Sequence, residues 1–176
     1  MTTRANRRTA GRAGPEDTIV RREIVRFADD TFGTRNWGHK GLALALRRLS
    51  LAEAMWTPGP GLHSVWEQIN HLAYWKRYVR DRVRGRGRQT NQAWPPAGRT
   101  AAGLTRAVAG LRRLHRDLRR DVLRLPAETY GAAGGPRYST TQLLLGEAAH
   151  DAYHIGQIFL TRKLYRRRAA AGRRGA

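Results

Sequence analysis

The chain has 176 residues, of which 34 are Lys or Arg and 13 are Asp or Glu, so its formal net charge is +21. It contains no cysteine, which excludes disulfides, zinc–thiolate clusters and cysteine nucleophiles and leaves His, Asp and Glu as possible metal ligands. No apolar signal-peptide core follows the basic N-terminus and no run of 18 apolar residues occurs, so we expect a cytoplasmic protein without a membrane span.

Part of the positive charge lies at the two ends of the chain. Residues 1–14 contain four Arg, residues 166–176 contain five, and neither segment contains an acid, so we expect both to be disordered tails. Residues 15–165, predicted to form one domain, still hold 25 basic and 13 acidic residues. Solubility and an Arg-rich composition explain such a surface, and so does an anionic partner such as nucleic acid, although no recognisable nucleic-acid-binding motif accompanies it.

Leu, Ala and Arg recur at helical spacing, and strand-like alternation is rare, so the sequence predicts an all-α chain. The expected helices cover residues 17–31, 37–49, 64–84, 101–124 and 139–165, with a short helical turn beginning at Ser50. Together they predict a four-helix bundle with an extra N-terminal helical element. The connection over residues 85–99 is long for a bundle, which favours a functional role.

Local patterns predict where these helices begin and which side chains they bury. Ser64 with Glu67, and Ser139 with Gln142, have the spacing of capping boxes. In the first helix we expect Ile19, Ile24 and Phe27 to be buried, and in the last helix a stripe that extends to Leu164.

Four residues separate His150 from His154 in a predicted helix, which places two imidazoles on one face, where they can bind one transition metal. No histidine follows, so a third histidine ligand must lie upstream. His71 is the best candidate because it lies in the middle of an amphipathic helix whose face is predicted to point into the bundle. Three imidazoles would leave coordination positions open for water or substrate. The alternative is a metal-free bundle in which the histidines form internal hydrogen bonds.

Other side chains near this pattern are candidates for supporting roles. A zincin-like protease helix needs Glu beside the first histidine, and Asp151 stands there, so that reading is disfavoured. Asp151 and Glu147 can instead orient a ligand or accept a proton, or simply form helix ion pairs. His63 and Trp75 are candidates for binding substrate. His115 is expected at the surface or behind the ligands.

Two segments resemble the DinB-like superfamily, the damage-inducible four-helix-bundle proteins that include YfiT-like proteins. These segments are residues 60–75, with His63, Trp66, Glu67 and His71, and residues 146–158, with the His150-Asp-Ala-Tyr-His154 motif. The resemblance extends over residues 17–165 and implies a left-handed bundle of the up-up-down-down type, often dimeric. It also implies one divalent metal ion per chain, zinc or nickel, held by His71, His150 and His154.

The resemblance implies chemistry as well. Such proteins include thiol-dependent transferases and isomerases that use low-molecular-weight thiols, and metal-dependent hydrolases. We therefore predict a metal-dependent enzyme of thiol-transferase or hydrolase type that acts on a small-molecule substrate in a stress or damage response. The strongly basic composition departs from the family. The alternative prediction is a non-enzymatic stress protein whose basic surface binds nucleic acid and whose metal site is structural or vestigial.

Overall fold

The computed structural model describes residues 15–34, 37–86, 99–132, 134 and 137–172, and within these it contains helices and no strand. The prediction of an all-α bundle is confirmed. Four long helices form the body, and two short helices and one 3₁₀ turn connect them: α1 (Pro15–Phe32), α2 (Leu42–Ala45), α3 (Leu51–Met55), α4 (Val65–Val83), α5 (Ala101–Leu123), η1 (Ala127–Thr129) and α6 (Thr140–Gly172). None of the described helices is long and apolar enough to cross a membrane.

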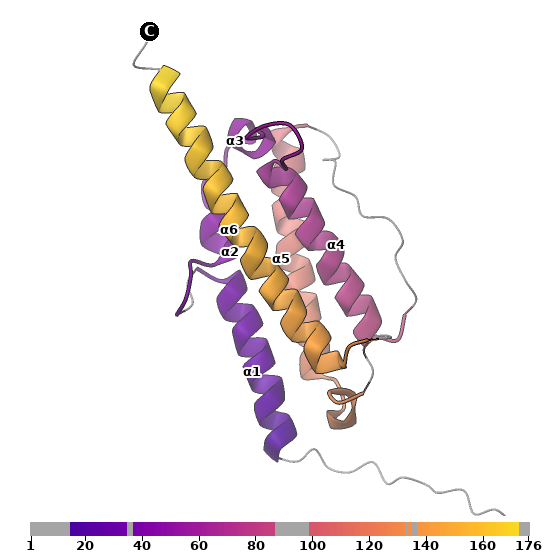
Figure 1. The fold of residues 1–176 in the computed structure, drawn as a ribbon. Helices are drawn as coiled ribbons and strands as arrows, with labels where there is room; N and C mark the ends of the chain where they lie inside the picture. Colours follow the sequence, from indigo (N-terminus) through magenta and orange to yellow (C-terminus); the bar gives the residue numbers. More distant parts are fainter. Residues whose placement is uncertain (1–14, 35–36, 87–98, 133, 135–136, 173–176) are drawn as a thin grey trace, which may run out of the picture.

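The four long helices form two parallel pairs. In Figure 1, α1 and α6 run upward, whereas α4 and α5 run downward side by side. The end of α4 and the start of α5 therefore lie at opposite ends of the bundle, and a long connection is needed to join them. Most of this connection, residues 87–98, lies outside the described residues. The functional role predicted for it therefore stays a prediction.

The predicted capping boxes are confirmed. Ser64 Oγ accepts a hydrogen bond from the Glu67 amide at 3.2 Å, and Glu67 Oε2 accepts one from the Ser64 amide at 2.7 Å. Ser139 and Gln142 exchange the same two bonds at the start of α6. These side chains satisfy amides that the first turn of a helix leaves without a partner, and they fix where the two site-bearing helices begin.

The helix predicted over residues 37–49 is wrong, because only the four residues of α2 are helical there. The chain instead folds back on the end of α1, with the Gly41 and Ala43 amides donating to the Thr34 and Gly33 carbonyls. A Cβ at Gly41 would lie 2.2 Å from the Gly33 oxygen. This close approach of two backbone segments needs glycine and leaves no room for a helix entering from Trp37.

Three further predictions about helices need correction. In α1 the buried side chains include Ile24 and Val25, whereas Ile19 and Phe27 are exposed. Leu164 is also exposed. The helix α6 continues to Gly172, so residues 166–172 are helical and do not belong to a disordered tail, because Arg and Ala are good helix formers and no Pro interrupts them. Residues 1–14 and 173–176 lie outside the described residues.

The bundle interior contains two apolar clusters at different heights. The upper cluster in Figure 1 joins α2, α3 and the first halves of α4 and α5 to the middle of α6, and its largest members are Leu42, Trp66, Ile69, Leu72, Leu111, Ile155 and Ile158. The lower cluster joins α1 to the last halves of α4 and α5 and the start of α6, with Ile24, Val25, Val79, Leu118, Val122, Tyr130 and Leu144. Between them lies a layer of polar side chains.

Candidate metal centre

The polar layer draws side chains from all four long helices. Its members are Asp29 of α1, His71 and Lys76 of α4, His115 of α5, and Glu147, His150, Asp151 and His154 of α6. A polar layer inside a core destabilises the fold unless each buried group finds a partner. The layer consists of two parts, a histidine cluster and a set of ion pairs.

The structure brings together the three histidines that the sequence predicted as ligands. The Nε2 atoms of His71 and His150 lie 3.2 Å apart, and those of His150 and His154 lie 3.1 Å apart. One ligand atom from each lies within 4.8 Å of the others. Bonds of about 2.0 to 2.1 Å to a tetrahedral zinc place its nitrogen ligands about 3.3 Å apart. The cluster therefore has the dimensions of a three-histidine metal site.

The protonation of these histidines also suits a metal. Burial, followed by the charge of a neighbouring imidazole of the cluster, lowers the pKa of each imidazole to about 4. At neutral pH all three rings are uncharged, and uncharged imidazole is the form that coordinates a metal. His71 and His154 are buried and His150 is half-buried. Three neutral, converging imidazoles can hold a divalent metal ion.

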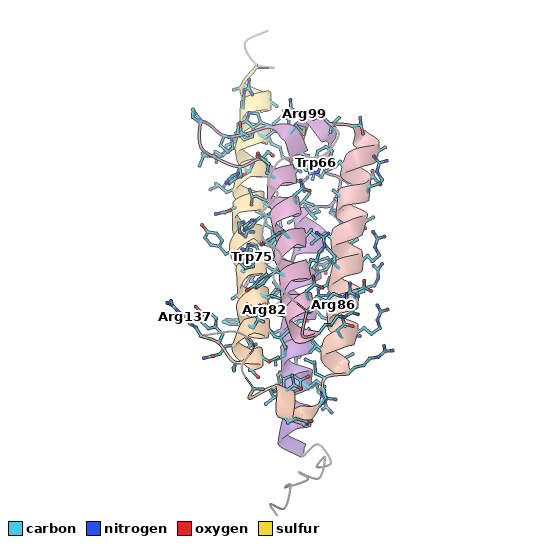
Figure 2. All side chains as sticks on the ribbon, turned by 90° about the vertical axis from the view of Figure 1, so that its right-hand side faces the viewer. Trp66, Trp75, Arg82, Arg86, Arg99 and Arg137 are labelled. Atoms are coloured by element: carbon cyan, nitrogen blue, oxygen red, sulfur yellow. The ribbon has the colours of Figure 1, made fainter. Side chains whose placement is uncertain are left out.

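Trp75 lies against this cluster. Its indole Nε1–H donates a hydrogen bond to His71 Nε2 at 3.1 Å, and the two rings meet edge to face. Figure 2 shows Trp75 about half-way along the bundle, between α4 and α6. His63, the other predicted substrate residue, is exposed at the start of α4 with its Nδ1 3.9 Å from Glu67 Oε2. It precedes His71 by two helical turns.

The carboxylate oxygens of Glu147 and Asp151 that accept hydrogen bonds face Lys76 and not the histidines. Both bind the ammonium group of Lys76, at 2.5 Å from Glu147 Oε1 and 2.6 Å from Asp151 Oδ2. All three side chains are buried. Burial and the neighbouring Glu147 raise the pKa of Asp151 to about 7, against the attraction of Lys76. Burial alone lowers the pKa of Lys76, but the two carboxylates outweigh it and raise that pKa above its usual value.

Lys76 was missed in the sequence although a signal was present. It follows Leu72 by four residues and precedes Val79 by three, so it lies on the buried stripe of α4. On α6, Asp151 lies in the same way between Ala148 and Ile155. A cation and an anion on the buried stripes of two predicted helices are good candidates for a buried ion pair.

His115 lies behind these ion pairs and is buried. Its ring stacks on Phe32 at 4.0 Å, and its Nε2 lies 3.0 Å from Asp29 Oδ1. Phe32 also lies close to the ion pairs, because the centre of its ring is 5.5 Å from Lys76 Nζ. Burial, followed by the charge of Lys76, lowers the pKa of His115 to about 4 although Asp29 opposes this shift. His115 is therefore a neutral donor to Asp29.

A pocket of about 350 Å³ opens beside the histidine cluster. It shares His150 and Glu147 with the polar layer, and its full lining is Trp75, Val79, Tyr138, Gln142, Leu143, Gly146, Glu147 and His150. The lining is mostly apolar, with His150 at one end. In Figure 2, Arg82 and Arg137 lie below Trp75 on the same face of the bundle. The histidine cluster is thus reachable from a cavity large enough for a small molecule.

Fold and site together define an all-α bundle whose interior holds a three-histidine centre able to bind a divalent metal. The family model of the DinB superfamily matches residues 37–158, well over half of the chain, and the protein belongs to this superfamily. The match includes all three histidines and ends inside α6. No curated protein and no solved structure matches the chain.

Proposed function

We propose that this protein is a metal-dependent enzyme of thiol-transferase or hydrolase type that acts on a small-molecule substrate. His71, His150 and His154 would hold one divalent ion per chain. The observation that supports an enzyme most directly is the pocket of about 350 Å³ that ends at His150 and Trp75. A purely structural metal site would be closed off by protein on all sides, whereas His150 is half-buried and borders this cavity.

The donor set suits zinc or nickel, because neutral imidazoles are good ligands for both ions. A divalent ion bound there supplies Lewis-acid chemistry, either by deprotonating a thiol or by lowering the pKa of water to about 7. The first gives the thiol-transferase reaction and the second the hydrolase reaction. Both need the same three histidines.

The side chains around the centre supply binding and orientation. Val79, Leu143 and the indole of Trp75 form an apolar wall for the carbon skeleton of a substrate. When His71 Nε2 binds a cation, its lone pair no longer accepts the indole N–H, so Trp75 becomes free to donate to the substrate. Arg82 and Arg137 lie on the same face and carry charge suited to a carboxylate of a substrate or of a low-molecular-weight thiol.

Filling the pocket tests the proposal without touching the histidines. Gly146 lines the pocket on α6, and a Cβ there meets nothing within 4 Å. The matched control is Gly156, which is exposed on the same helix, also has open space, and lies outside the pocket. We expect Gly146→Leu to retain zinc and nickel but to lose turnover at least tenfold.

Turnover would be measured on metal-loaded protein with two panels, thiols paired with a chromogenic electrophile, and chromogenic esters and amides. Gly156→Leu should keep the wild-type rate in the panel that responds. Equal rates for the Gly146→Leu and Gly156→Leu variants would contradict the proposed pocket, and the absence of metal-dependent turnover in both panels would contradict the proposed class of enzyme. The homodimer and the link to stress remain predictions, the first to be checked by sedimentation of the purified chain.

A further inference from the structure

A second cavity, of about 930 Å³, lies between α2 and the C-terminal half of α6. We call it the α2–α6 groove, and its lining residues are Lys40, Leu44, Arg47, Arg48, Phe159, Arg162, Lys163, Arg166, Arg167 and Ala170. In Figure 1 this part of α6 rises past the tops of the other helices. The α6 wall begins at Phe159, one residue after the region matched by the family model, whereas the wall formed by residues 40–48 lies within that region.

The groove is rich in cations and its lining contains no acid. Five of its basic side chains, Lys40, Arg47, Arg48, Lys163 and Arg167, are exposed and form no ion pair with any residue of the described part of the chain. The acid nearest the groove is Glu53, which is buried beneath it. Its carboxylate is shared by Arg162, at 2.9 and 3.0 Å, and Arg166, at 3.0 Å. One acid thus offsets two of the seven cations.

Arginines elsewhere on the bundle are only partly paired with acids. On α4 and α5, Arg80 and Arg84 bind Asp121, and Arg80 and Arg120 also bind Asp117. The exposed Arg113 and Arg116 of α5 form no ion pair with the described residues. The α2–α6 groove differs from that face because its seven cations line one concave surface.

Two cations of the groove, Arg162 and Arg166, are held in place by contacts beneath the groove. Arg162 is buried and fixed by Glu53 and by the carbonyl oxygen of Ala45, which ties α6 to α2 and α3. Lys163 and Arg167 lie one turn apart on α6, and this spacing corresponds to a rise of about 6 Å along the helix. They form a row of charge along one wall, and Arg47 and Lys40 stand on the other.

Arg48 adds an independent observation. Its φ is +52°, in the left-handed region, and it is the only non-glycine residue with positive φ in the described part of the chain. This conformation costs a residue with a side chain about 1 kcal/mol. Backbone strain of this kind is concentrated at sites of function. The strained residue is one of those that line the groove.

We propose that the α2–α6 groove binds the phosphate backbone of nucleic acid, without regard to sequence. Repeated negative charges along a strand match a row of arginines and lysines, and arginine binds phosphate with two parallel hydrogen bonds. The groove is concave, and its larger apolar residues, Leu44 and Phe159, are half-buried in its floor. The site is separate from the histidine centre and does not depend on the proposed enzyme.

Fluorescence anisotropy of the full chain with a labelled 20-base single strand and a 20-base-pair duplex, titrated between 50 and 200 mM salt, tests this proposal. The groove variant is Lys163→Ala with Arg167→Ala. The matched control is Arg113→Ala with Arg116→Ala, which removes two exposed charges from α5 outside the groove. We expect the groove variant to bind at least tenfold more weakly at 50 mM salt and to lower the slope of log affinity against log salt by about 1.5 to 2.

The control pair should change affinity less than threefold. Melting curves of both variants check that each remains folded, which their exposed positions favour. Equal losses in the two variants would overturn the proposal, because binding would then come from diffuse charge or from the ends of the chain. Failure of the wild type to bind either probe at 50 mM salt would also overturn it. So would groove-dependent binding to vesicles of phosphatidylserine and phosphatidylcholine without binding to either oligonucleotide.

Discussion

The charged side chains of the polar layer are mostly buried and paired, whereas most of those in the α2–α6 groove are exposed and unpaired within the described part of the chain. In the layer, Lys76 is buried, and its Nζ binds the carboxylates of Glu147 and Asp151 at 2.5 and 2.6 Å. In the groove, Lys163 is exposed and has no ion pair with the described residues. A buried charge without a partner is very costly, whereas an exposed charge is stabilised by water. Pairing in the layer is therefore a condition of folding, and the unpaired groove cations are available for a partner.

The comparison also separates two kinds of nitrogen-rich site. The histidine cluster consists of neutral imidazoles, since burial lowers the pKa of each to about 4, and its lone pairs are directed at a small cation. The groove consists of permanent cations directed at anions. His154 of the proposed cation site and Lys163 of the proposed anion site lie nine residues apart along α6.

The largest effect is expected from breaking the buried ion pairs. Lys76→Met keeps the length of the side chain but leaves Glu147 and Asp151 facing each other without a cation. Removing one partner of a buried pair costs about 3 to 5 kcal/mol, and we expect a loss of this size in the free energy of unfolding. Chemical denaturation at pH 7 measures it. Lys163→Met is the matched control and should change stability by less than about 0.5 kcal/mol.

A smaller loss is expected where a buried pair has a spare partner. Arg162→Met removes the bidentate contact to Glu53 and the hydrogen bond to Ala45, but Arg166 still binds the same carboxylate. We expect a loss of about 2 to 3 kcal/mol, below that of Lys76→Met. In the Arg162→Met background, Arg166→Ala should lower the free energy of unfolding by more than Arg166→Ala lowers it in the wild-type chain. Strict additivity of the two variants would mean that Arg166 does not support Glu53.

The pH dependence of stability should report the buried His115. The pKa of this ring is about 4 in the fold and about 6.5 in the unfolded chain, so the unfolded state takes up the proton first as the pH falls. A lowered pKa gives stability that is complete above pH 6.5 and is lost toward pH 4. Between pH 7 and pH 5 we expect a loss of about 1 to 2 kcal/mol from this group.

Denaturation of chelator-treated protein at both pH values, beside His115→Gln, isolates this contribution. Glutamine keeps a donor for Asp29 but has no proton to gain. The variant should lose less stability than the wild type on acidification. An identical loss in the two proteins would mean that His115 titrates normally.

The smallest effect is expected at Arg48, where the strain of the groove can be removed. Glycine adopts the left-handed conformation freely, although it adds entropy to the unfolded chain, so Arg48→Gly should stabilise the fold by about 0.5 kcal/mol. Affinity for the labelled duplex should fall at the same time. Stabilisation without any loss of binding would separate the strain from the proposed anion site.

Local sequence patterns predicted the parts of the structure that depend on near neighbours. The capping pairs at Ser64 and Ser139 fix two helix starts because they act across three residues. The spacing of His150 and His154 predicted a shared helix face in the same way, and the amphipathic segment around His71 predicted its direction. These are the signals that a helix of 3.6 residues per turn imposes on a sequence.

Features that join distant segments were missed. Arg162 and Glu53 lie 109 residues apart, and Lys76 and Asp151 lie 75 apart, so no local pattern links them. The fold-back at Gly41 depends on the end of α1, which replaced the predicted second helix with one turn. The groove lies between α2 and α6, which are far apart in the sequence, and three of its lining residues, Arg166, Arg167 and Ala170, fall in the segment that the sequence suggested was disordered. Tertiary contacts decided each of these cases.

Metal content tests the central proposal most directly. The purified chain, loaded with zinc or nickel and passed over a desalting column, would be measured by elemental analysis beside His150→Ala with His154→Ala. The control is His39→Ala with His63→Ala, which removes two histidines outside the cluster. About one ion per chain in the wild type and control, and almost none in the first variant, is the predicted result. Equal metal in all three proteins, or none in the wild type, would contradict it.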